Sequence, residues 1–127
     1  MTKLKAILID DEKGSLESLS YELREYCPEV EVVASSQDPK EGLRLIQKWS
    51  PDLLFLDIEM PGMNVFEFLQ QVSDLSLHVI FVTAYDQFAI RAFDFNAIDY
   101  VLKPVRKTKL ISAVQKVVDR QQPKLDT

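Results

Sequence analysis

Short runs of apolar residues recur along this chain, and polar or charged residues interrupt them. The three strongest runs are Ala6 to Ile9, Leu53 to Leu56 and Leu77 to Val82. Each run is too short for a buried helix and too uniform for a half-exposed strand, so each predicts a strand in the middle of a sheet. Weaker runs at Val30 to Ala34 and Tyr100 to Leu102 bring the number of predicted strands to five.

Segments with a helical period lie between the predicted strands. Near Asp38 the sequence supplies an N-cap, a proline at the first helical position and a capping-box acid at Glu41, so a helix is predicted from there toward Trp49. Two other stripes have apolar residues three or four positions apart and predict amphipathic helices. Their members are Leu16, Leu19, Leu23 and Tyr26 in one stripe, and Leu110, Val114, Val117 and Val118 in the other.

Strands that alternate with helices, and that are apolar on both faces, indicate a parallel sheet covered by helices on both sides. The predicted fold class is therefore α/β, with a (βα)5 doubly wound sheet. For five strands the common solution is the flavodoxin-like strand order 2-1-3-4-5. In such sheets the working site lies at the carboxyl ends of the strands, which directs attention to the residues that follow each apolar run.

Length and charge narrow the possibilities further. The 127 residues fit one domain, and a single cysteine, Cys27, cannot form an internal disulfide. The longest apolar runs fall far short of the roughly twenty residues that span a membrane, so a cytoplasmic protein is expected. The formal net charge is −5, and most of the acidic residues precede Lys103. An acidic body argues against direct nucleic-acid binding by this domain.

Two clusters of acids follow the first and third predicted strands. Asp10, Asp11 and Glu12 follow one, while Asp57 and Glu59 follow the other. A parallel sheet brings these ends together, where each pair of carboxylates repels by about 4 kcal/mol at 4 Å and an effective dielectric of 20. Several carboxylates without paired histidine or cysteine favour Mg²⁺ over zinc as the ion that offsets this repulsion. Each cluster taken alone also fits a solvated acidic turn.

A hydroxyl and an ammonium group complete the candidate site. Thr83 ends the fourth predicted strand, and Lys103 follows the fifth. A carboxylate such as that of Asp57 can act as a nucleophile toward phosphorus when a metal and a lysine neutralise the developing charge. The Lys103-Pro104 bond is also a candidate for a cis peptide, because the cis form is accessible before proline.

These residues occur within motifs that resemble the receiver domain of two-component response regulators, over nearly the whole chain from Lys5 to about Gln121. The motifs are Asp10-Asp11, the segment from Leu56 to Met63, Thr83-Ala84, and the segment from Tyr100 to Pro104. The resemblance implies a phosphoacceptor that catalyses its own phosphorylation and dephosphorylation, with a sensor histidine kinase as donor and Mg²⁺ as cofactor. Phosphorylation would then change the surface of helix four, strand five and helix five, which is also a candidate homodimer interface.

The resemblance also assigns a role to each matching residue. Asp57 would be the phosphoacceptor, and Thr83 with Lys103 would hold the phosphoryl oxygens. The implied metal ligands are Asp57, Asp11 directly, Asp10 mainly through water, and Glu59 through its backbone carbonyl. Thr83 and Tyr100 match the switch positions.

A narrower resemblance, over Thr83 to Pro104, is to receivers of the LytTR-type branch. In that branch a LytTR DNA-binding output domain follows the receiver and the protein regulates transcription. We therefore expect a receiver over residues 1–121 and the start of a linker over residues 122–127, either as an excised domain or as a stand-alone receiver. The favoured interpretation is that the chain is an excised domain.

Some features depart from the pattern or allow another interpretation. Val65 stands where receivers usually carry glycine, so the turn before helix three is expected to close through Gly62 and Asn64. Glu59 adds a carboxylate that could alter hydrolysis of the phosphoryl group. An alternative function is a Mg²⁺-dependent phosphohydrolase with an aspartyl intermediate, although its Asp-x-Asp pair is not present after the first strand. A flavodoxin is excluded because Asp-Asp-Glu would repel a flavin phosphate.

Several single residues have a structural interpretation. Cys27 is expected to be structural, and the lone histidine, His78, is expected to have a structural or surface role rather than a catalytic one. Five aromatic residues lie close together near the fourth strand and the predicted fourth helix. They fit either core packing or a partner-facing surface that phosphorylation changes, and their members are Tyr85, Phe88, Phe93, Phe95 and Tyr100.

Overall fold

Five parallel strands form a single sheet in the order β2-β1-β3-β4-β5, as the sequence predicts. The computed structural model describes residues 3–72, 75–85 and 97–121. The strands are β1 (Leu4–Ile9), β2 (Val30–Ser36), β3 (Leu53–Leu56), β4 (His78–Thr83) and β5 (Asp99–Leu102). The described helices are α1 (Lys13–Tyr26), α2 (Pro39–Trp49), α3 (Val65–Val72) and α5 (Lys107–Gln121).

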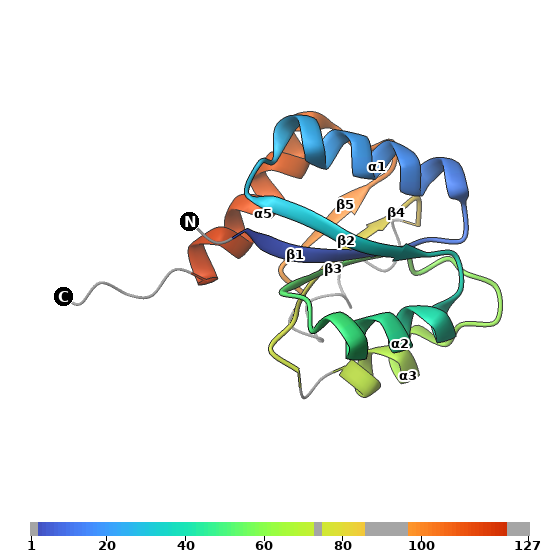
Figure 1. The fold of residues 1–127 in the computed structure, drawn as a ribbon. Helices are drawn as coiled ribbons and strands as arrows, with labels where there is room; N and C mark the ends of the chain where they lie inside the picture. Colours follow the sequence, from blue (N-terminus) through green and yellow to red (C-terminus); the bar gives the residue numbers. More distant parts are fainter. Residues whose placement is uncertain (1–2, 73–74, 86–96, 122–127) are drawn as a thin grey trace.

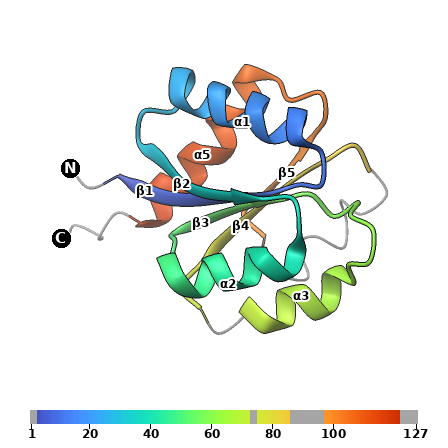
Figure 2. The same cartoon turned by 45° about the vertical axis from the view of Figure 1, so that its right-hand side comes forward.

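Helices cover both faces of the sheet, with α1 and α5 on one side and α2 and α3 on the other (Figures 1 and 2). This two-sided cover explains why β3 is apolar at every position. The predicted fourth helix, with Phe88, Phe93 and Phe95, lies outside the described residues. Within the described ranges, no helix is both long and apolar enough to cross a lipid bilayer.

The strand register aligns the carboxyl ends of the central strands. Ile9 pairs with Leu56 between β1 and β3, and Leu56 pairs with Phe81 between β3 and β4. Thr83 at the end of β4 then pairs with Leu102 at the end of β5. The residues that follow β1, β3 and β5 therefore emerge at the same edge of the sheet.

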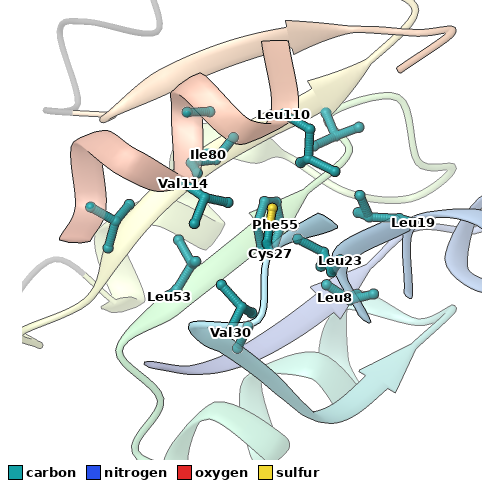
Figure 3. Close-up of a cluster of buried hydrophobic side chains, with 14 of the residues drawn as sticks. Leu8, Leu19, Leu23, Cys27, Val30, Leu53, Phe55, Ile80, Leu110 and Val114 are labelled. Atoms are coloured by element: carbon teal, nitrogen blue, oxygen red, sulfur yellow. The ribbon is translucent and has the colours of Figure 1, made fainter. Parts of the chain in front are cut away.

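The core between the sheet and helices α1 and α5 contains the single cysteine. Cys27 lies among buried residues that include Leu23, Phe55 and Leu110 (Figure 3). Burial, with a smaller contribution from Glu29, raises the pKa of the Cys27 thiol to about 11. The thiol therefore stays protonated at neutral pH, as a structural role for this residue requires.

One member of the predicted apolar stripe is not buried. Leu16, Leu19 and Leu23 lie in the core, but Tyr26 is 37% exposed, so the prediction that Tyr26 faces the core is wrong. Helix α1 ends at Tyr26. The centroid of the Tyr26 ring lies 4.5 Å from the Nζ of Lys107 at the start of α5, an arrangement that suits an aromatic residue at the surface.

The predicted helix start at Asp38 is present, but its hydrogen bonds differ from a capping box. Asp38 accepts a hydrogen bond from the Lys40 backbone N–H at 3.3 Å. The Glu41 carboxylate accepts from the Ser36 hydroxyl at 2.7 Å, and the Asp38 backbone N–H donates to the same hydroxyl oxygen at 2.9 Å. Ser36 at the end of β2 therefore mediates the contact that Glu41 and Asp38 would make directly.

Helix α3 accommodates Val65 without a left-handed backbone. The Asn64 side chain accepts from the backbone N–H groups of Phe66 at 3.0 Å and Glu67 at 3.2 Å, so Asn64 acts as the N-cap. Gly62 supplies the positive φ of 75° in the preceding turn. Among described residues other than glycine only Ser50 has a positive φ, so Asn64 contributes through its side chain rather than through the positive φ that the sequence suggested.

Asp99 at the start of β5 is a buried carboxylate held by two lysines of α5. Its oxygens accept hydrogen bonds from Lys109 and Lys116, each at 2.9 Å, and from the backbone N–H of Tyr100 at 2.8 Å. Burial alone would raise the pKa of Asp99, but the hydrogen bonds from the two lysines outweigh that effect and lower it. The ion pairs therefore join strand β5 to helix α5.

Replacing Gly42 by alanine is expected to lower the free energy of unfolding by about 1 kcal/mol. A Cβ at Gly42 would lie 2.4 Å from Cδ1 of the buried Ile9. Such overpacking costs about 1 to 3 kcal/mol, against a helix-propensity gain of about 1 kcal/mol. Gly14→Ala is the matched control: no atom lies within 4 Å of its Cβ position, so urea unfolding should show stabilisation. Equal effects of both variants would contradict the close approach of α2 to β1.

Replacing Asp99 by asparagine is expected to lower the free energy of unfolding by about 2 kcal/mol at neutral pH. Because folding depresses the pKa of Asp99, its ionised form stabilises the protein above the ordinary value of 3.8, and this contribution is lost as the pH falls through the folded-state value. In urea unfolding at several pH values, the gap between wild type and variant should shrink below pH 3.8. A gap that widens on acidification would contradict the assignment.

Candidate functional site

Two buried aspartates lie side by side where β1 and β3 end. The Asp57 backbone N–H donates to the Ile9 carbonyl at 3.0 Å, which ties the end of β3 to the end of β1. The Asp10 backbone N–H donates to the Ser36 carbonyl at 3.1 Å. Asp10 is only 6% exposed and Asp57 only 4%. Both carboxylates therefore have little access to water, and their charges must be balanced within the protein.

Asp11 joins these aspartates to form a cluster of oxygen ligands. One carboxylate oxygen from each of Asp10, Asp11 and Asp57 lies within 4.8 Å of the others. Burial raises the pKa of Asp10, although its hydrogen bond from Lys103 opposes the change. A set of hard carboxylate oxygens at this separation fits a divalent cation such as Mg²⁺. The fold therefore brings together the three aspartates that the sequence predicts to share one site.

Lys103 bridges the two buried carboxylates. Its Nζ lies 2.7 Å from Asp10 Oδ2 and 2.8 Å from Asp57 Oδ2. The backbone N–H of Lys103 donates to the Thr83 carbonyl at 2.9 Å, which fixes the lysine at the end of β5. Burial alone would lower the pKa of Lys103, but its contacts with Asp10 and Asp57 outweigh burial and raise it, so the side chain is an ammonium ion. The peptide bond between Lys103 and Pro104 is cis.

Lys103 has two further partners at the start of α1. Its Nζ lies 3.2 Å from Ser15 Oγ and 3.4 Å from Glu12 Oε1. Ser15 Oγ in turn donates to Glu12 Oε1 at 3.2 Å. Ser15 is not among the residues that the sequence motifs predict for the site. The available signal was its position three residues after Glu12 in the first turn of a predicted helix, where both side chains can share one face.

Thr83 and Tyr100 are connected through the backbone of Tyr85. Thr83 is completely buried, and its Oγ1 accepts from the Tyr85 N–H at 3.2 Å. The hydroxyl of Tyr100 donates to the Tyr85 carbonyl oxygen. The Tyr100 ring is buried and packs against Phe81, with 6.0 Å between ring centroids. One residue of the loop after β4 thus contacts both predicted switch residues.

The remaining predicted residues occupy distinct positions. The Glu59 side chain is exposed, while its backbone N–H donates to Asp57 Oδ1 at 2.8 Å. The main chain of Glu59 therefore lies beside the aspartate. His78 begins β4, at the opposite end of that strand from Thr83, and its Nε2 lies 3.2 Å from Gln121 Oε1. This position fits the structural role expected for the histidine.

Known proteins with similar sequences are response regulators. A 43% identical relative over 124 residues is described as an uncharacterised response regulatory protein of Vibrio cholerae, and the match covers 97% of this chain but 52% of that protein. A 32% identical relative is the sensory transduction protein LytT of Bacillus cereus, with 98% of this chain and 51% of that protein covered. LytT is the kind of relative that the resemblance to the LytTR-type branch implies. The chain spans about half the length of these relatives.

Solved structures give the same result at the level of the fold. The response regulatory domain of protein mrkE from Klebsiella pneumoniae superposes with a TM-score of 0.83 at 30% identity, covering 94% of this chain and all of that one. The receiver domain of AraT from Geobacillus stearothermophilus gives 0.80 at 31% identity, covering 92% of this chain and 94% of that one. The family model described as the response regulator receiver domain matches residues 6–115. The chain therefore belongs to the response regulator receiver domain family of two-component systems.

Proposed function

We propose that this domain accepts a phosphoryl group on Asp57 from the phosphohistidine of a sensor histidine kinase, with Mg²⁺ as cofactor. The observation that carries the proposal is the position of Lys103 Nζ, which lies within 2.8 Å of oxygens of both Asp10 and Asp57. A fixed ammonium group beside a buried carboxylate suits a nucleophile that must approach an anionic phosphorus centre. Membership of the receiver family supports the same assignment.

The chemistry assigns a separate task to each residue. A carboxylate oxygen of Asp57 forms a bond to phosphorus as the bond from phosphorus to the donor ring nitrogen breaks, and that nitrogen keeps the electron pair. Lys103 offsets the negative charge on the phosphoryl oxygens. Since Thr83 Oγ1 accepts from the Tyr85 N–H, we assign the hydroxyl proton of Thr83 to donation toward a phosphoryl oxygen.

The acidic cluster supplies the residues that would hold Mg²⁺. Asp11 is the direct ligand in this proposal, Asp57 contributes an oxygen, Asp10 acts mainly through water, and Glu59 contributes its backbone carbonyl. The three aspartate oxygens within 4.8 Å of one another support this set. When bound, the ion neutralises charge on the carboxylates and the phosphoryl group.

The connection through Tyr85 offers a route from the site to the surface. Drawing the Thr83 hydroxyl toward a phosphoryl group changes its bond to the Tyr85 N–H, and the Tyr85 carbonyl is the partner of Tyr100. We propose that this shift changes the surface formed by β5, α5 and the predicted fourth helix and thereby its preference for a partner, including a second copy of the domain. The signal leaves the domain as a change in a protein contact.

We further propose that the regulated partner is an output domain that follows residue 121. The relatives are about twice as long as the matched region, and they include LytT. A LytTR-type DNA-binding domain would make transcription the regulated process. On this proposal the protein acts in the cytoplasm, residues 1–121 form the receiver and residues 122–127 begin the linker.

Incubation with acetyl phosphate and Mg²⁺ is expected to add a single phosphoryl group, detected by intact-protein mass spectrometry. Asp57→Asn should abolish the adduct because the amide lacks the nucleophilic carboxylate. Asp119→Asn, which changes an exposed aspartate of α5, is the matched control and should be phosphorylated like wild type. A chelator should also abolish the adduct.

A separate assay with small phosphomonoesters distinguishes this function from the alternative phosphohydrolase. A hydrolase would release phosphate from these esters over many turnovers, whereas the proposed phosphoacceptor is expected to release none above background. An adduct that persists in Asp57→Asn would disprove the assignment of the nucleophile.

Asp11→Asn is expected to weaken Mg²⁺ binding by more than about tenfold in calorimetric titrations, because a direct anionic ligand is lost. Relief of repulsion within the cluster should leave the free energy of unfolding unchanged or raised. Glu59→Gln is the matched control, since only its backbone is assigned to the metal, and its Mg²⁺ affinity should stay within about twofold of wild type. A larger loss in Glu59→Gln than in Asp11→Asn would contradict the assigned ligands.

A further inference from the structure

The ammonium group of Lys103 has two kinds of partner. Asp10 and Asp57 hold it from the strand ends at 2.7 and 2.8 Å. Ser15 and Glu12 hold it from the start of α1 at 3.2 and 3.4 Å. The second pair is itself joined by the hydrogen bond from Ser15 Oγ to Glu12 Oε1. The lysine is therefore held from two separate elements of the fold.

The first pair of partners also belongs to the residues that the proposed function assigns to the cation and to phosphorylation. Lys103 contacts Oδ2 of Asp10 and Oδ2 of Asp57, and these carboxylates belong to the cluster assigned to the cation. Asp57 is also the group that would become an acyl phosphate, which changes its charge and shape. An aspartate engaged in this chemistry would hold the lysine less firmly at the stage when the lysine must face the phosphoryl oxygens.

Ser15 and Glu12 belong neither to the cluster assigned to the cation nor to the group that is phosphorylated. Ser15 stands in the first turn of α1, and its neighbour Leu16 is buried in the core, so the backbone position of Ser15 is fixed by packing. The Glu12 side chain is 68% exposed, and water screens its charge. Ser15 is less exposed than Glu12, and it contacts both the lysine and the glutamate. Ser15 is therefore the better placed of the two to orient the ammonium group.

We propose that Ser15, supported by Glu12, is a positioning residue that keeps Lys103 aimed at the phosphoryl group after Asp10 and Asp57 have been engaged by the cation and the reaction. The inference rests on the proposed phosphoacceptor function. Ser15 and Lys103 also line the same groove of about 350 Å³ between α1 and the segment after β5.

The test compares Ser15→Ala with Ser15→Thr and with Ser18→Ala. Ser15→Thr keeps the hydroxyl. Ser18→Ala removes an exposed serine that lines the same groove on the same helix but is not among the hydrogen-bond partners of Lys103. At saturating Mg²⁺ and acetyl phosphate, Ser15→Ala should phosphorylate about tenfold more slowly than wild type, the size of effect expected when a hydrogen bond to a charged group is lost. Ser15→Thr and Ser18→Ala should stay within about twofold of wild type.

A second measurement does not depend on phosphorylation. The side-chain amino resonance of Lys103, assigned by its loss in Lys103→Ala, is recorded by ¹⁵N NMR in the Mg²⁺-saturated protein. The resonance should shift in Ser15→Ala and remain in place in Ser18→Ala, while the backbone amide spectrum of α1 beyond the substituted turn stays unchanged. This readout reports the position of the ammonium group rather than the stability of the helix.

The outcomes separate the two proposals. If wild type is not phosphorylated, the proposed function fails, and the Lys103 resonance still decides whether Ser15 positions the lysine. If wild type is phosphorylated but Ser15→Ala matches Ser18→Ala in rate, the inference about Ser15 is overturned. An unshifted Lys103 resonance in Ser15→Ala overturns it as well, because any loss of rate would then have another cause.

Discussion

The contact between the Lys103 ammonium and the carboxylates of Asp10 and Asp57 is the interaction on which the site depends. Two almost fully buried carboxylates repel each other by several kcal/mol in a medium of reduced dielectric. The Lys103 ammonium contacts both carboxylates and offsets this repulsion. The contact is possible only because the parallel register ends β1, β3 and β5 at one edge of the sheet.

A similar solution serves a different purpose at the start of β5. The buried carboxylate of Asp99 is paired with Lys109 and Lys116, which keeps its pKa low and joins β5 to α5. There the lysines are about half exposed and the pairing is structural, whereas Lys103 is 18% exposed and faces other titratable groups. Burial of the ammonium, together with the number of acids around it, distinguishes the candidate functional site from the structural ion pair.

Patterns along the sequence predicted the strands and helices well, but they predicted the burial and hydrogen-bond partners of single residues less well. The alternation of apolar runs and helical stripes led to the observed strand order, because burial on both faces leaves a strong trace in the sequence. The same logic failed at Tyr26, where the helical period continued to the helix end although the core did not. At Glu41 the residue type suited a capping box, but the Ser36 hydroxyl offered a competing partner from another element.

The residues that follow the strands can be read from the order of amino acids alone, and these residues include the acids, the hydroxyl and the lysine of the candidate site. The contact of Ser15 with Lys103, the pairing of Asp99 with two lysines of α5, and the link from Thr83 through Tyr85 to Tyr100 became visible in the packed fold. This difference arises because strand and helix patterns come from burial, which the order of residues records. Contacts between polar side chains of separate elements depend on how the elements pack, and the pattern along the chain carries little trace of that packing.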